Sequence, residues 1–298
     1  MKNILIIGCG LLGSSLLRKI QKKRLAKKIF IYEKSKANIL KIKKLKLPGT
    51  IINKLQHGVI NSDLIIICTP MSEYKNLILK MNKFLSSKTI ITDIGSSKLE
   101  SSKIIKKFLK KNIFWTSSHP ITGSEVSGPE HGKQDLFENK WCILINDKKT
   151  NKGHLILLRK FWKKIGSKVV TMTSEKHDKI FSITSHLPHL IAYNLVKSAQ
   201  DFEEKQNFDL IKYSAGGLRD FSRIAASNEI MWRDIFFNNK NNMSKAINLF
   251  IKNLNSFKKD INSKNNKSIL QKLIRTKKVR SKIIKLKHDI NKPDFGRS

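Results

Sequence analysis

Short apolar runs alternate with longer amphipathic segments over about the first 172 residues of the chain. The runs, which are rich in β-branched residues, read NILIIG, KIFIYE, LIIICTP, TIITDIG, IFWTSS, WCILIN and KVVTM. The segments between them have helical spacing, as in SKLESSKIIKKFLKK and in SEYKNLILKMNKFL, where Ser72 is the expected N-cap. Near-continuous apolar strands separated by helices predict a mostly parallel sheet covered on both faces, a doubly wound α/β fold.

The pattern changes near residue 172. After Thr173 helical spacing takes over, from 174 to 202, from 208 to 237 and from 243 to the tail. Pro188 lies inside the first of these segments and should kink or divide it. An Asn- and Lys-rich stretch at 262–267 predicts an exposed turn. We therefore expect two domains with a core each, a Rossmann-like domain at 1–172 and an all-helical domain at 173–298.

Several classes of protein are disfavoured by composition. At 298 residues and 40% hydrophobic content the chain is typical of a globular protein, and no run approaches the ~18 to 20 apolar residues of a membrane helix. The apolar stretch Ile4 to Ile7 is shorter than the ~7 to 15 residues of a secretory signal, so we expect neither export nor a lipid anchor at Cys9. The three cysteines are far apart and unpaired in pattern, which favours a reduced, cytoplasmic protein without a metal site.

The net charge of +38 would attract any polyanion, nucleic acid included. The excess is nevertheless spread along the whole chain, is mostly Lys, and accompanies abundant Asn and Ile, which is typical of an A/T-rich coding sequence. Its densest cluster, Lys264 to Lys287, has the spacing of a solvated helix face. We do not expect a nucleic-acid partner, and a basic nucleic-acid-binding protein on a Rossmann scaffold is kept as a remote alternative.

A glycine-rich loop, GCGLLGS, follows the first predicted strand and opens the first predicted helix. In this setting Gly8 permits a tight turn, Gly10 lets a pyrophosphate approach the backbone, and Gly13 lets the helix pack on the strand. Glu33 ends the second strand, twenty residues after Gly13, where an acidic residue binds the ribose hydroxyls. The loop therefore predicts a dinucleotide site at a helix N-terminus.

Glu33 would repel a 2′-phosphate, which favours NAD over NADP. Lys34 and Lys36 follow it and would offset part of that repulsion, although surface charge is the simpler explanation in so basic a chain. FAD shares the glycine fingerprint, but no additional flavin signature is present.

Candidate chemistry lies where two later strands end. In FWTSSHPITGSEVSG the strand ends at His119-Pro120, and in DIGSSK the preceding strand brings Asp93 and Ser96 to the same edge. Strand C-termini face the ligand crevice of such sheets, and a neutral imidazole can accept a proton from an alcohol as hydride leaves. A core or capping histidine is the competing interpretation of His119.

The helical half carries further polar groups. Arg219, Asp220 and Arg223 are close in sequence, and the last two can share a helix face. An arginine fork suits a substrate carboxylate. His186 and His189 are three residues apart, but no third ligand accompanies them, so a polar contact or helix packing is favoured over a metal site.

Several of these motifs recur in a fixed order in one known family. GCGLLGSSL, the pair Thr69-Pro70, DIGSSK, HPITGSEVSG, LFENKW, SHLPHL and GGLRDFSRIAASNEIMWRDI resemble those of prephenate and arogenate dehydrogenases, enzymes of tyrosine biosynthesis. The resemblance covers about residues 2 to 240. It implies a Rossmann domain, a helical dimerisation domain that makes a homodimer, and NAD-dependent oxidative decarboxylation of prephenate to 4-hydroxyphenylpyruvate in the cleft between them.

The resemblance also implies residue roles. His119 is similar to the histidine that polarises the ring hydroxyl, and Ser96 to the serine that orients it. Arg223 resembles the arginine that binds a substrate carboxylate, with Asp220 beside it, and His189, Glu125 and Trp232 match positions near the substrate. The implied cofactor-binding set is Gly8, Gly10, Leu11, Leu12, Gly13, Glu33, Thr69, Pro70 and Asp93.

Two departures and two alternatives accompany this interpretation. Asn228-Glu229 stands where relatives often have an acidic residue and proline, and Leu218 replaces a common Phe, which leaves fine substrate preference open. Arogenate is the alternative substrate. A 3-hydroxyacid dehydrogenase is a second alternative, but that related group lacks the HPxxGSExSG and RDxxR segments. From the length of the chain we expect neither an appended chorismate mutase nor a C-terminal regulatory domain.

Overall fold

A computed structural model describes residues 2–207 and 209–286 of the chain. Phe208 and residues 287–298, which belong to the predicted helical domain, lie outside the described residues. The strands are β1 (Asn3–Ile7), β2 (Lys28–Tyr32), β3 (Thr50–Ile51), β4 (Leu64–Ile67), β5 (Ile90–Asp93), β6 (Ser118–Pro120), β7 (Trp141–Ile145) and β8 (Lys168–Met172). Each of the seven apolar runs overlaps one of these strands, and β3 is additional.

These strands form two sheets. The first is parallel, with the order β3-β2-β1-β4-β5, and the second has the order β6-β7-β8 with β6 antiparallel to β7. An isolated bridge between Ile91 and Trp115 ties the run at 113–118 to the first sheet. The run then leaves that sheet because the Ser117 carbonyl accepts from the Ile145 N–H. The parallel Rossmann-like sheet is confirmed, whereas its continuation through the 113–118 run as one sheet is wrong.

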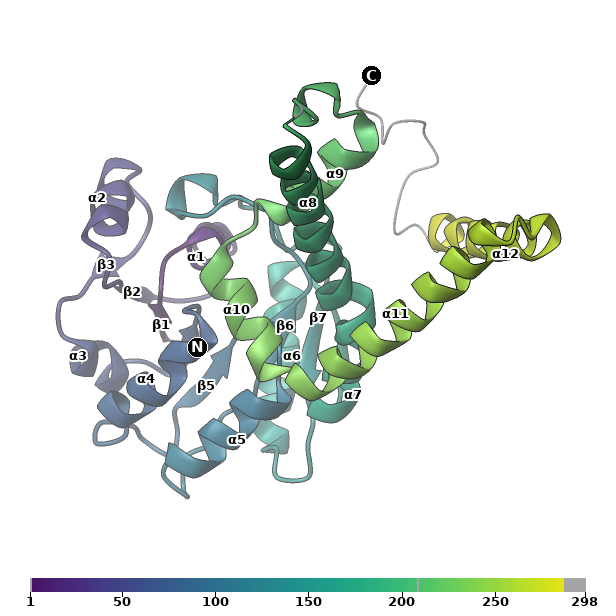
Figure 1. Cartoon of the computed structure of the whole chain (residues 1–298). Helices are drawn as coiled ribbons and strands as arrows, with labels where there is room; N and C mark the ends of the chain where they lie inside the picture. The colour runs from purple at the N-terminus through teal and green to yellow at the C-terminus, as the bar shows by residue number, and fades with distance from the viewer. Residues whose placement is uncertain (1, 208, 287–298) are drawn as a thin grey trace.

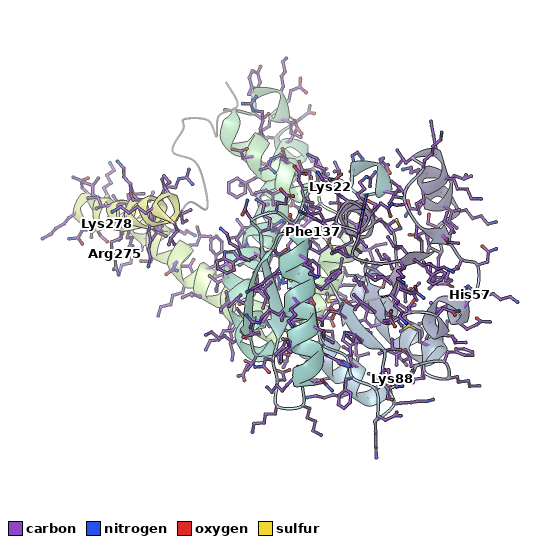
Figure 2. All side chains as sticks on the ribbon, turned by 180° about the vertical axis from the view of Figure 1, so that it is seen from behind. Lys22, His57, Lys88, Phe137, Arg275 and Lys278 are labelled. Carbon is purple, nitrogen blue, oxygen red and sulfur yellow. The ribbon has the colours of Figure 1, made fainter. Side chains whose placement is uncertain are left out.

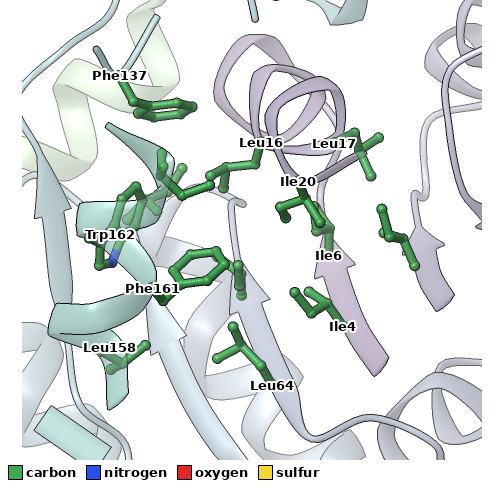
Figure 3. Close-up of a cluster of buried hydrophobic side chains, with 14 of the residues drawn as sticks. Ile4, Ile6, Leu16, Leu17, Ile20, Leu64, Phe137, Leu158, Phe161 and Trp162 are labelled. Atoms are coloured by element: carbon green, nitrogen blue, oxygen red, sulfur yellow. The ribbon is translucent and has the colours of Figure 1, made fainter. Parts of the chain in front are cut away.

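Helices cover both faces of the first sheet (Figure 1). Side chains alternate along β1, so that Ile4 and Ile6 face one buried cluster and Leu5 and Ile7 face the other. The first cluster also contains Leu16, Phe161 and Trp162 (Figure 3). The helices of this half are α1 (Leu11–Lys22), α2 (Lys36–Lys44), α3 (Leu55–Ile60), α4 (Tyr74–Met81), α5 (Leu99–Phe108) and α6 (Lys152–Ile165), with short turns at Met71–Glu73 and Pro129–His131.

The rest of the described chain is helical, as predicted. Its helices are α7 (Ser174–Phe181), α8 (Leu187–Gln206), α9 (Gly216–Ala225), α10 (Glu229–Asn238), α11 (Lys240–Asn262) and α12 (Asn266–Lys285), with a 3₁₀ turn at Ile211–Tyr213. A π-helical turn, Ser182–His186, separates α7 from α8 just before Pro188. The predicted exposed turn lies between α11 and α12. The basic cluster falls on α12, apart from Lys287, which lies outside the described residues.

Among the described residues the helical half forms no buried hydrophobic cluster of its own, and its separate core stays a prediction. Trp232 and Ile235 of α10 instead join the cluster that contains Leu5 and Ile7. Figure 1 shows α11 leading away from the body with α12 at its far end, and Figure 2 shows Arg275 and Lys278 across the molecule from His57. This arm exposes large apolar side chains: Leu249, Ile251, Leu254, Ile261, Leu270, Leu273, Ile274, Val279 and Ile283.

One local prediction fails at the start of α4. Ser72 is not its N-cap, because it lies in the 3₁₀ turn before the helix. Its backbone N–H donates to Asp234 Oδ2 at 2.9 Å, which ties this turn to α10. No helix within the described ranges is long and apolar enough to cross a membrane.

Candidate active site

The glycine loop joins β1 to α1 in a conformation that requires glycine. Gly8 has a φ of +87°, in the left-handed region. A Cβ on Gly13 would lie 2.2 Å from the Gly8 carbonyl oxygen, so only glycine lets α1 approach β1 this closely. Gly10 is the N-cap and faces open space, and it has no side chain to occupy the N–H groups of Leu11 and Leu12. The first turn of α1 can therefore receive an anion.

Glu33 lies beside this loop. Its Oε2 accepts from the Cys9 N–H at 2.8 Å and its Oε1 from the Ser35 N–H at 2.9 Å, which holds the carboxylate at the mouth of the loop. Burial, and to a lesser extent Glu33, raise the pKa of the Cys9 thiol to about 12, so Cys9 stays a neutral core thiol. Glu33 therefore lies next to the glycine loop, and its contact with a ribose hydroxyl stays a prediction.

The end of β4 completes this side of the site. Thr69 packs against the loop, since its Cγ2 lies 3.0 Å from where a Gly8 Cβ would be. The Thr69 hydroxyl is buried and has no hydrogen-bond partner among the described residues, and Pro70 follows it at the surface. An orphaned hydroxyl next to a glycine loop, an open helix N-terminus and a fixed carboxylate together fit a bound dinucleotide.

Asp93 is bonded to several groups inside the protein. The side chains of Asp93 and Lys98 are fully buried and form an ion pair of 2.6 Å. Tyr74 and Trp115 also donate to the carboxylate, each at 2.9 Å. Burial raises the pKa of Asp93, but Lys98 and the hydrogen bonds from Trp115 and Ser117 outweigh it and leave the pKa below the ordinary value. Asp93 also accepts from the Gly95 N–H at 3.0 Å, so it holds the loop that carries Ser96, and its role in cofactor binding stays a prediction.

The same network reaches His119. Lys98 Nζ also donates to the Ser118 carbonyl at 2.7 Å, so it fixes the backbone next to the imidazole. His119 lies on β6, is 8% exposed, and its Nδ1 lies 2.7 Å from His177 Nε2. Burial, with the nearby His177, Lys98 and His186, holds the pKa of His119 well below its ordinary value. The imidazole is therefore neutral at pH 7, as a proton acceptor has to be.

His177 and Asp178 continue the hydrogen-bonded chain from His119 into the protein. Neither residue was identified from the sequence. His177 Nδ1 lies 2.7 Å from Asp178 Oδ1. The Asp178 oxygens also accept the backbone N–H groups of Lys98 and Leu99, both at 2.8 Å. One carboxylate of α7 thus caps the start of α5, directly after the Ser96 turn.

Side chains of the helical half lie near this network, because His186 interacts with both His177 and His189. His189 stacks on Trp232 with ring centroids 3.8 Å apart, and its Nδ1 donates to the Ser185 carbonyl at 2.9 Å. Burial lowers the pKa of His189, and the Trp232 N–H is buried without a partner among the described residues. The Trp232 N–H is thus available to a ligand, and the His189 imidazole beside it is neutral at pH 7.

Arg223 and Glu125 come together from different halves. Arg223 lies on α9 with Asp220, and its Nη1 is 3.8 Å from Glu125 Oε2 on the HPITGSEVSG loop. Both side chains are partly exposed, so the pair is loose and accessible to solvent. His186, the other histidine of SHLPHL, is buried against Asn239, and burial lowers its pKa to about 4.

Comparisons with known proteins show the family to which this chain belongs. The family model described as prephenate dehydrogenase, nucleotide-binding domain, matches residues 16–171, and the model described as prephenate dehydrogenase, dimerization domain, matches residues 173–276. The chain belongs to the prephenate dehydrogenase family. The first family match begins after the glycine loop, so the case for that loop rests on its geometry.

Individual relatives are similar to this family member over nearly its whole length. The cyclohexadienyl dehydrogenase of Zymomonas mobilis is 32% identical over 97% of this chain and 98% of its own. The prephenate dehydrogenase of Bacillus subtilis is 30% identical over 86% of this chain and 69% of its own. The structure of the A. aeolicus prephenate dehydrogenase in complex with hydroxyphenyl propionate and NAD+ superposes with a TM-score of 0.88 at 34% identity, covering 95% of this chain and 98% of that one.

The sequence departures of this family member have local explanations in part. Asn228 is the N-cap of α10, where its side chain accepts from the Met231 N–H at 2.9 Å. It therefore starts the helix that carries Trp232 without the proline common in relatives. Nothing in the structure explains Leu218.

Proposed function

We propose that this protein catalyses the NAD-dependent oxidative decarboxylation of prephenate to 4-hydroxyphenylpyruvate in tyrosine biosynthesis. The observation that carries the proposal is His119, a buried, neutral imidazole whose Nδ1 is already bonded, which leaves Nε2 for a substrate hydroxyl. The reaction also requires a site for NAD and a site for a substrate carboxylate. The glycine loop can supply the first and Arg223 the second. We place the reaction in the cytoplasm, in keeping with three free thiols.

The chemistry of the substrate explains why these groups suffice. Bound NAD accepts hydride from the hydroxyl-bearing ring carbon. As that carbon loses hydride, the bond to the ring carboxylate breaks, its electron pair enters the ring, carbon dioxide leaves and the ring becomes aromatic. His119 holds the hydroxyl proton while charge develops and returns it to the phenolic oxygen, so no net proton is released. Ser96, on the turn that Asp93 holds through the Gly95 N–H, orients the hydroxyl.

Arg223 is the proposed carboxylate clamp. Its guanidinium faces Glu125 across a loose contact, and a substrate carboxylate offers a shorter, two-pronged partner. His189 and Trp232 are the proposed polar contacts of the same substrate. Glu33, which is held next to the glycine loop, favours NAD over NADP.

Arogenate is the second candidate substrate. The similarity to a cyclohexadienyl dehydrogenase over 97% of the chain favours it. Arogenate differs from prephenate only in the side chain, away from the reacting ring atoms, so the same chemical step applies to both.

The purified protein should form NADH and carbon dioxide from prephenate with NAD, more slowly with NADP. In the same assay, Arg223→Gln should raise KM for the accepted substrate at least ~10-fold with a smaller change in kcat, because one charge-assisted contact is lost. Preferential turnover of arogenate would transfer the function to the second candidate. Turnover of neither substrate would overturn both.

We further propose that the active protein is a homodimer through the helical half. The exposed apolar side chains of α11 and α12 form a surface that a monomer would leave in water. Sedimentation at micromolar concentration should give twice the mass of the chain, and Leu254→Lys with Leu270→Glu should give monomers. A wild-type monomer would contradict this assignment.

A further inference from the structure

The pair His177 and Asp178 is unused by the mechanism above, yet it touches the catalytic imidazole. His119 belongs to β6 of the Rossmann-like half and His177 to α7 of the helical half, so their 2.7 Å contact crosses between the halves. His119, His177 and Asp178 are at most 8% exposed. Phe181 lies against both imidazoles, with ring centroids 5.1 Å from His119 and 4.5 Å from His177. The contact is therefore dry and geometrically fixed.

Hydrogen bonding determines where the protons lie in this chain of groups. Asp178 accepts two backbone N–H groups, so it can only be an acceptor toward His177, and His177 Nδ1 must carry a hydrogen. Burial lowers the pKa of His177 despite Asp178, so its ring is neutral and its Nε2 accepts. His119 Nδ1 therefore donates to His177, and the lone pair of His119 is on Nε2.

We propose that His177 and Asp178 are positioning residues that fix the tautomer and orientation of His119, so that its Nε2 lone pair meets the substrate hydroxyl. This rests on the proposed function only for the identity of that hydroxyl. Because Asp178 of the helical half also receives the N–H groups that open α5 of the Rossmann-like half, the arrangement exists only when the two halves are docked. His119 is therefore oriented for catalysis only while the helical half is packed against the Rossmann-like half.

Two substitutions separate positioning from packing. In His177→Phe the ring volume is kept but the acceptor is lost, and kcat should fall at least ~100-fold while KM for NAD and substrate change less than ~3-fold. In His177→Gln the amide oxygen can accept from His119 Nδ1, and kcat should recover to within ~10-fold of wild type. His57→Gln, on the exposed face of α3, is the matched control and should leave kcat unchanged.

The result that would overturn the proposal is near-normal kcat in His177→Phe, or equal losses in the Phe and Gln variants. A second measurement does not depend on turnover or on the variants. In the wild-type chain with ¹⁵N-labelled histidine, the His119 resonances should show protonated Nδ1 and unprotonated Nε2 at pH 7. The opposite tautomer would refute the positioning role, whereas the expected tautomer in a chain inactive on both substrates would refute only the proposed function.

Discussion

His119→Asn should lower kcat about 10³-fold and leave NAD affinity within about twofold of wild type. His119 supplies the group that holds the hydroxyl proton, and the asparagine amide has no comparable basicity. The glycine loop, Glu33 and Thr69 do not depend on the imidazole, so the dinucleotide should still bind. A loss of this size corresponds to about 4 kcal/mol of transition-state stabilisation. Steady-state kinetics together with NAD titration by fluorescence would measure both quantities.

The pH profile provides a second check on His119. A base must be unprotonated to act, and the pKa of His119 is held well below 6.5 by burial, His177, Lys98 and His186. Asp178 reaches it only through His177. Wild-type kcat should therefore be flat from about pH 8 to about pH 6 and fall at lower pH as the imidazole is protonated. Normal turnover in His119→Asn, with His57→Asn as the control, would show that the base has been misassigned.

Most of the fold could be predicted because its signals are local. Strands β1, β2, β4 and β5 are each mostly apolar, as burial on both faces of a parallel sheet requires. β3 was missed since it is only Thr50–Ile51 and has no apolar run to announce it. The second sheet was missed for a different reason. Strand pairing depends on partners far along the chain. Nothing in IFWTSS indicates that this segment pairs with Ile91 of the first sheet and then continues into a strand that pairs with β7.

Site residues, too, could be predicted from the sequence only where the signal is local. The glycine loop and His119 lie in motifs whose residues act next to one another, so sequence reasoning located them. Lys98 and Asp93 form a buried pair that no local pattern predicts. His177 and Asp178 did leave a signal, because Ser174, His177, Asp178 and Phe181 are spaced as one face of a helix and that face is buried. Titratable residues on the core-facing positions of a helix are costly unless paired, and this indicates a function or a partner.

Lys98→Met should destabilise the fold by about 3 to 5 kcal/mol, since it leaves the fully buried Asp93 without its cation. Lys98 also bonds the Ser118 carbonyl beside His119, so activity should fall as well. Urea unfolding would measure the change. The matched control is Lys103→Met in α5, whose exposed pair with Glu100 should matter by less than about 0.5 kcal/mol.

The pH dependence of this loss should have a definite sign. In the wild type the folded-state pKa of Asp93 is below its ordinary value of 3.8, so its contribution to stability is present above that pH and is lost as pH falls through the folded value. Without Lys98, burial dominates and raises the pKa of Asp93 in the folded protein, so the penalty is greatest at neutral pH and shrinks as the carboxyl takes up a proton. The difference in free energy of unfolding between wild type and Lys98→Met should therefore become smaller toward pH 4.

Adding Asp93→Asn to Lys98→Met should restore part of the stability at pH 7, because no buried charge is left unpaired. A difference that is independent of pH, or a double variant no more stable than the single one, would mean that Lys98 acts through packing and not through its charge.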